Sequence, residues 1–169
     1  VEKLLRAERS ARVAYLCAME ARWPRLVVFD LDYTLWPLWV DTHVDPPLKQ
    51  TQHINQVVDR YVRCALTPRG GQPLSFYDPV PYVPHHSRQE ILFLLRQNGV
   101  KIGAASRTHA PTVAKQALAG LMITPQAPQA PPVSALSLFD YMEIYPGSKV
   151  AHFRRLAQLS GIPFQDMRM

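Results

Sequence analysis

Two aspartates separated by one residue, Asp30 and Asp32, are the side chains of this sequence best suited to chemistry. They follow the apolar run Leu26–Phe29, and alternation along an extended strand end places both carboxylates on one side while Leu31 points away. Like charges this close favour either a shared proton or a bound divalent cation, and oxygen ligands favour magnesium. From the pair alone, a structural role remains open, in which Asp30 caps a turn and Asp32 is solvated.

Two other polar residues follow elements that we expect to lie beside that first strand. Ser106 comes directly after the apolar run Val100–Ala105, and Lys149 lies in the first turn of a predicted helix. A serine in this position is commonly a cap or turn residue, and a lysine is commonly a solvated surface residue. The helix dipole, however, disfavours a cation in the first turn. Both residues are therefore candidates for holding an anion near Asp30.

The elements that must position these residues alternate between strands and helices. Leu26–Phe29 and Val100–Ala105 are short apolar runs, typical of buried parallel strands. Between them, the capping-box pattern Ser87–Glu90 and Gly99 predict the two ends of a helix. A second helix is expected from Ala110 to Gly120.

The rest of the chain continues this alternation. Pro125–Pro132 predicts an unstructured proline- and alanine-rich insertion, and Tyr141–Tyr145 predicts a short strand. Pro146–Ser148 then opens a helix that Gly161 ends. Its predicted core face consists of Val150, Phe153, Leu156 and Ala157.

Alternating strands and helices predict an α/β fold, in which ligands bind outside the carboxyl ends of the parallel strands. Asp30 and Asp32, Ser106, and Lys149 all fall on that edge. After Ile162–Phe164 one more strand is expected, yet the sequence ends at Met169. We therefore expect the sheet to lack its last strands.

Composition narrows the class of protein. A chain of 169 residues has room for one ordinary domain. Its net charge of +6 favours anionic ligands such as phosphate esters, nucleic acid or acidic lipids. There is no apolar run of about 18 residues, so no membrane-spanning helix is expected. Cys17 and Cys64 stand alone, which favours a reducing, cytoplasmic compartment. We expect a monomer.

The string Phe29–Leu35, FDLDYTL, resembles the first motif of the haloacid dehalogenase-like superfamily. The resemblance implies a Rossmann-like sheet with helices on both faces. It makes Asp30 the nucleophile that attacks phosphorus, and Asp32 the general acid and base. It further implies that Ser106 binds phosphate, with Arg107 supplying its backbone N–H, and that Lys149 is the lysine of the third motif.

Longer strings resemble the small eukaryotic magnesium-dependent phosphatases within that superfamily. They are Val28–Pro37, Trp39–Pro47, Ala104–Thr108 and Glu143–Lys149. This resemblance implies an Mg²⁺ cofactor held by Asp30 and Asp32, and an indole, that of Trp39, beside the leaving group. Substrate contacts are expected from Leu31, Asp32, Trp39, Ser106, Arg107 and Lys149. The implied substrates are phosphotyrosine proteins, phosphorylated sugars or glycated amines.

The chain also departs from that family. The strand of the fourth motif, which ends in paired acids that help bind magnesium, is missing, and Asp166 is not expected to replace them. We predict an N-terminal extension with a helical pattern over residues 1–24 and a phosphatase domain, incomplete at its C-terminus, over residues 25–169. Residues 41–84 are predicted to form a divergent loop or lid.

Two other functions remain open. The first is a catalytically impaired, truncated relative that binds phosphorylated ligands without turnover. The second is a basic nucleic-acid binder, which the charge permits but no motif supports, so we expect no nucleic-acid partner. Membrane partners are not expected either.

Overall fold

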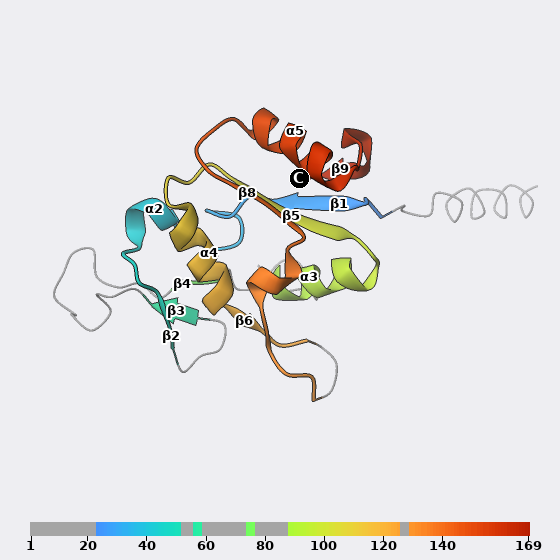
Figure 1. The fold of residues 1–169 in the computed structure, drawn as a ribbon. Coiled ribbons are helices and arrows are strands. Elements are labelled where there is room, and N and C mark those ends of the chain that lie inside the picture. The colour runs from blue at the N-terminus through green and yellow to red at the C-terminus, as the bar shows by residue number, and fades with distance from the viewer. Residues whose placement is uncertain (1–22, 52–55, 59–73, 77–87, 126–128) are drawn as a thin grey trace, which may run out of the picture.

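A parallel sheet forms the centre of the molecule (Figure 1). The computed structural model describes residues 23–51, 56–58, 74–76, 88–125 and 129–169. In this part of the chain the sheet has four strands in the order β8-β5-β1-β9, and all of its pairs are parallel. Its strands are β1 (Leu26–Phe29), β5 (Lys101–Ser106), β8 (Tyr141–Ile144) and β9 (Met167–Arg168).

Helices cover both faces of this sheet, which confirms the predicted α/β fold (Figure 1). The helix α5 (Lys149–Ser160) lies on one face, whereas α3 (Arg88–Gln97) and α4 (Pro111–Gly120) lie on the other. The two faces of β1 reflect this arrangement, because Leu26 and Val28 are fully buried beneath α5. On the opposite face, Val27 and Phe29 are half-buried against the larger core.

Smaller elements complete the fold. The segment after β1 contains the short helix α2 (Val40–His43). Within the segment predicted to be a lid, the described residues form an antiparallel sheet of β2 (Lys49–Gln50), β3 (Gln56–Val58) and β4 (Leu74–Ser75). This sheet packs closely on α4, since a Cβ added at Gly120 would lie 2.5 Å from Cγ1 of Val57.

Several boundaries match the sequence-based expectations. The strand Leu26–Phe29, the helix ending at Gly120, the strand at Tyr141 and the helix ending before Gly161 are all confirmed. Gly161 has a φ of +66° and caps α5, which explains the choice of glycine there. The Ser87 capping box and the predicted extension up to residue 22 lie outside the described residues.

A short hairpin flanks the proline-rich segment Pro125–Pro132. Met122–Ile123 (β6) pairs in antiparallel fashion with Val133–Ser134 (β7) on the other side of that segment. A 3-10 helix, Ala135–Leu138, follows and contributes Ala135 and Leu138 to the core. Residues 126–128 lie outside the described part of the chain, so the expectation of an unstructured insertion between these two strands stays a prediction.

The end of the chain differs from the expectation. A short strand is present after Phe164, because Met167 and Arg168 pair in parallel with Leu26 and Val27. A 3-10 helix, Phe164–Asp166, leads into it. Asp166 lies beside Arg25 at the start of β1, with its Oδ2 atom 3.6 Å from the Arg25 Nη1 atom. This is the end of β1 opposite to Asp30, which agrees with the expectation that Asp166 does not replace an acid of the fourth motif.

The core face of α5 is shifted relative to the prediction. Val150 is 60% exposed, whereas Leu156 and His152 are completely buried. His152 is held by its Nε2 atom, which lies 3.1 Å from the carbonyl oxygen of Tyr145. Its Nδ1 atom is buried and has no hydrogen-bond partner in the described part of the chain. The geometry therefore favours a neutral imidazole that carries its proton on Nε2.

His152 makes the free energy of unfolding depend on pH. Burial lowers the pKa of His152 below its ordinary value of 6.5. Because the unfolded chain binds a proton at higher pH than the folded chain, we expect the free energy of unfolding to fall as pH drops below 6.5, until the folded-state pKa is passed. Urea titrations between pH 7 and pH 5 measure this effect. In His152→Gln the slope should be smaller, and an unchanged slope would contradict the assignment.

None of the helices in the described ranges is both long and apolar enough to cross a membrane.

Candidate active site

The two aspartates leave β1 through a tight turn. Asp30 follows the last residue of the strand, and its Oδ1 atom accepts a hydrogen bond of 2.9 Å from the Leu31 backbone N–H. Leu31 is completely buried, whereas Asp30 and Asp32 line the same pocket. The alternation predicted from the sequence is thus present. The side chain of Leu31 belongs to the core, and its backbone N–H donates to Asp30. Leu31 is not among the residues that line the pocket, so the predicted substrate contact of Leu31 is not seen.

Asp32 is oriented by two donors from the chain that follows it. The backbone turns back after Leu31, whose carbonyl accepts from Leu35 N at 2.8 Å. The Oδ1 atom of Asp32 then accepts from Trp36 Nε1 at 2.7 Å and from Val40 N at 3.1 Å. Burial raises the pKa of Asp32, and these hydrogen bonds oppose the rise in part. Trp36 is fully buried in the core and also positions Asp32.

Lys149 contacts Asp30 directly. Its Nζ atom lies 2.8 Å from Asp30 Oδ2 and also donates to the carbonyl oxygen of Ala105. The side chain of Ser148 caps the helix by accepting from Ala151 N at 3.1 Å, which fixes where α5 begins. A cation in the first turn of a helix is unfavourable with respect to the helix dipole. The carboxylate and the carbonyl offset this cost, so the lysine is held beside Asp30.

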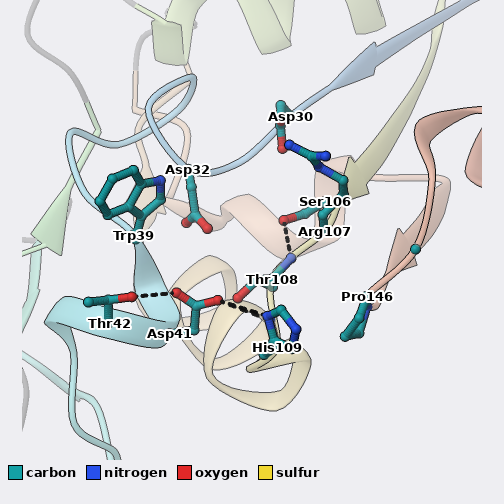
Figure 2. A pocket seen from close by; sticks show the side chains of 11 residues that line it. Asp30, Asp32, Trp39, Asp41, Thr42, Ser106, Arg107, Thr108, His109 and Pro146 are labelled. Atoms are coloured by element: carbon teal, nitrogen blue, oxygen red, sulfur yellow. Dashed lines mark hydrogen bonds and ion pairs between the residues drawn. The ribbon is translucent and has the colours of Figure 1, made fainter.

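Ser106 approaches from the neighbouring strand. It is the last residue of β5, is 1% exposed and lines the pocket with Arg107. Its hydroxyl oxygen accepts a hydrogen bond of 3.3 Å from the Thr108 backbone N–H (Figure 2). Parallel pairing of β5 with β1 brings Ser106 to the same edge as Asp30. The structure therefore brings Asp30, Asp32, Ser106, Arg107 and Lys149 together as predicted.

Trp39, with its aromatic neighbours Tyr33 and His43, forms one wall of the pocket. Trp39 lines it and is 52% exposed. Its ring packs edge-on against Tyr33 at a centroid distance of 5.1 Å and stacks on His43 at 5.6 Å. The backbone N–H of Trp39 also donates to His43 Nδ1 at 3.1 Å. His43 therefore helps to position the loop that carries Trp39.

Sequence analysis missed several pocket residues. They are Asp41, Thr42, Thr108, His109, Pro146 and Gly147 (Figure 2). All of them except His109 lie inside the strings that carry the family resemblance, but no pattern in the sequence assigned them to the site. Proximity in sequence did not show which residues of the loop face inward, because that depends on the short helix α2.

The pocket has a volume of about 490 Å³ and a polar lining. Carboxylates, a hydroxyl group and a nearby ammonium group converge there, which suits a ligand with a phosphate group. In proteins Mg²⁺ keeps several waters and binds one or two carboxylates together with substrate phosphate. Asp30 and Asp32 fit that donor set.

Comparison with known proteins places the chain in a family. The acid phosphatase family model matches residues 22–169. The human Magnesium-dependent phosphatase 1 is 43% identical over 150 residues, which are 87% of this chain and 66% of that protein. A HAD-like hydrolase superfamily protein of Schizosaccharomyces pombe is 40% identical over 146 residues, covering 86% of this chain and 73% of the relative. The chain thus spans about two thirds of the length of the human relative.

Among solved structures, one match is the N-terminal part of the Bacteroides fragilis protein BF1531, containing a phosphatase domain complexed with Mg. It has a TM-score of 0.49 and 16% identity, and the match covers 90% of this chain and 31% of that chain. The range matched by the family model includes Asp30, Ser106 and Lys149. The chain therefore belongs to the acid phosphatase family, within the haloacid dehalogenase-like superfamily.

Proposed function

We propose that this chain is a magnesium-dependent phosphomonoesterase that works through an aspartyl-phosphate on Asp30. The observation that carries the proposal is the contact of 2.8 Å between Lys149 Nζ and Asp30 Oδ2, at the edge of a pocket that Asp32 and Ser106 also line. The name of the human relative supports the dependence on magnesium. When bound by Asp30 and Asp32, Mg²⁺ would neutralise charge on the transferring phosphoryl group.

The proposed reaction has two displacements. An oxygen of the Asp30 carboxylate attacks phosphorus, the bond from phosphorus to the ester oxygen breaks, and protonated Asp32 gives its proton to the departing alkoxide. Asp32, now a carboxylate, takes a proton from water as that water attacks the phosphorus of the aspartyl-phosphate. The bond to Asp30 breaks and inorganic phosphate leaves. Ser106 and Lys149 stabilise the charge on the phosphoryl oxygens.

The proposed substrates carry a phosphate ester on a group that can lie against an aromatic ring. These are phosphotyrosine proteins, or phosphorylated sugars and glycated amines. The half-exposed indole of Trp39 beside the pocket supports this choice, because an indole can stack on an aromatic ring or on the apolar face of a sugar.

Phosphate release tests the proposal. Purified protein with p-nitrophenyl phosphate should release phosphate when Mg²⁺ is added, and a chelator should stop the release. Mass spectrometry after a rapid acid quench should find a labile phosphate on the peptide that contains Asp30. Folded protein that shows neither result would overturn the proposal.

A second candidate is phosphate binding without turnover. It is favoured by one observation: Lys149 Nζ lies 2.8 Å from Asp30 Oδ2, so the carboxylate that would bind Mg²⁺ already has a cationic partner. Calorimetry distinguishes the two candidates. Binding of inorganic phosphate without binding of Mg²⁺ supports this second function, whereas binding of both supports the enzyme.

The hydrogen bond from Trp36 to Asp32 predicts a coupled loss of stability and turnover. Trp36→Phe removes the donor, and we expect the free energy of unfolding to fall by about 1 to 3 kcal/mol. We expect kcat to fall more than KM rises, because Asp32 loses its orientation. Denaturant titration and steady-state kinetics measure both effects. Trp23→Phe, the same change at a residue that is 44% exposed, is the matched control. Equal kcat in the two variants would contradict the prediction.

A further inference from the structure

Asp41 joins two walls of the pocket that are far apart in the sequence. It lies in α2, two residues after Trp39. Its Oδ2 atom accepts a hydrogen bond of 3.1 Å from the His109 backbone N–H (Figure 2). His109 belongs to the loop between β5 and α4, which also carries Arg107 and begins at Ser106. This bond therefore connects the Trp39 wall with the Ser106 wall.

Further contacts strengthen the connection. The other oxygen of Asp41, Oδ1, accepts from the Thr42 hydroxyl at 3.0 Å, and His109 Nδ1 lies 3.6 Å from Oδ2. The bond from the His109 backbone N–H is the main reason why the pKa of Asp41 lies below its ordinary value. The carboxylate is thus ionised at neutral pH, when its hydrogen bonds are strongest.

The helix α2 is held at a second point as well. The backbone N–H of Val40 donates to Asp32 Oδ1 at 3.1 Å. Val40 and Asp41 thus bind to different parts of the site, one to the turn after β1 and the other to the loop after β5. Loss of the Asp41 contact leaves the Val40 contact in place. Without the Asp41 contact, we expect the aspartate pair to keep its geometry and Trp39 to lose its fixed distance from Ser106.

We propose that Asp41 is a positioning residue that fixes the Trp39 wall relative to the Ser106 wall. Asp41 thereby sets the preference of the site for aromatic leaving groups. This inference rests on the proposed function. Trp39 is the N-cap residue of α2 and its ring stacks on His43 in that helix, which couples Trp39 to α2. A phosphate ester that spans the pocket needs both walls at the correct separation, whereas a small acyl phosphate needs only the Ser106 side.

Two substrates test this idea. In Asp41→Ala we expect kcat/KM for p-nitrophenyl phosphate to fall about tenfold and that for acetyl phosphate to fall less than about threefold. Asp41→Asn keeps an oxygen that can accept from His109 N, and it should restore most of the lost activity. The control is Asp166→Ala, which removes an acid at the opposite end of β1. Equal losses on both substrates, or no loss on either, would overturn the inference.

A measurement that needs no catalysis separates this inference from the proposed function. The indole N–H signals of Trp36 and Trp39 can be resolved by NMR and assigned with single Phe variants. Asp41→Ala should increase the mobility of the Trp39 indole and leave that of the buried Trp36 indole unchanged. Unchanged Trp39 mobility rejects the positioning role, whether or not the protein hydrolyses phosphate. If the wild-type protein is inactive but Trp39 responds, only the proposed function fails.

Discussion

Replacing Asp30 by asparagine is expected to lower kcat by at least about a thousandfold, because the amide cannot form the phosphorylated intermediate. The change is nearly isosteric, so the turn after β1 should be kept. Removing the negative charge also removes repulsion against phosphate. We therefore expect inorganic phosphate to bind at least as tightly to Asp30→Asn as to the wild-type protein. Single-turnover kinetics and calorimetry measure the two quantities.

Asp166→Asn is the matched control for this experiment. Asp166 undergoes the same chemical change, but it lies beside Arg25 at the other end of β1. We expect its kcat to equal that of the wild-type protein. If Asp30→Asn turned over substrate at a similar rate while keeping its fold, Asp30 would not be the nucleophile. The proposed mechanism would then have to be abandoned.

The sequence predicted the central residues because their positions follow from local rules. Asp30 and Ser106 come at the ends of buried parallel strands, and such ends meet at one edge of the sheet. Lys149 was identifiable because a cation in the first turn of a helix needs a nearby partner. That partner is Asp30. In these cases secondary structure alone limits where the side chain can lie.

Other features depend on contacts between distant segments, so a local pattern could not show them. Asp41 meets His109 across 68 positions of sequence, and nothing in either neighbourhood indicates this pairing. Periodicity placed Val150 in the core of α5, yet the helix is rotated so that His152 is buried. His152 suits that position because its Nε2 atom reaches the Tyr145 carbonyl. One more strand was expected after Phe164, but β9 could not be located because two residues are too short for a recognisable pattern.

Replacing Lys149 by glutamine is expected to lower kcat/KM by about a hundredfold, which is the usual effect of removing one group that stabilises transition-state charge. The loss should be electrostatic, because Lys149 Nζ lies 2.8 Å from Asp30 Oδ2 and beside the Ala105 carbonyl. The unfavourable placement of Lys149 at the start of α5 is relieved by the same change. We therefore expect little net change in the free energy of unfolding.

Lys101→Gln should show the opposite behaviour and is the matched control for Lys149→Gln. Lys101 Nζ lies 2.9 Å from Asp140 Oδ1, at the end of β5 far from the pocket. Because half of its side chain is exposed, the pair is a partly screened surface contact, and we expect a small loss of stability with unchanged kinetics. Denaturant titrations and steady-state kinetics on both variants measure this contrast. If Lys149→Gln lost stability but kept its activity, the lysine would serve only to hold α5 against β5.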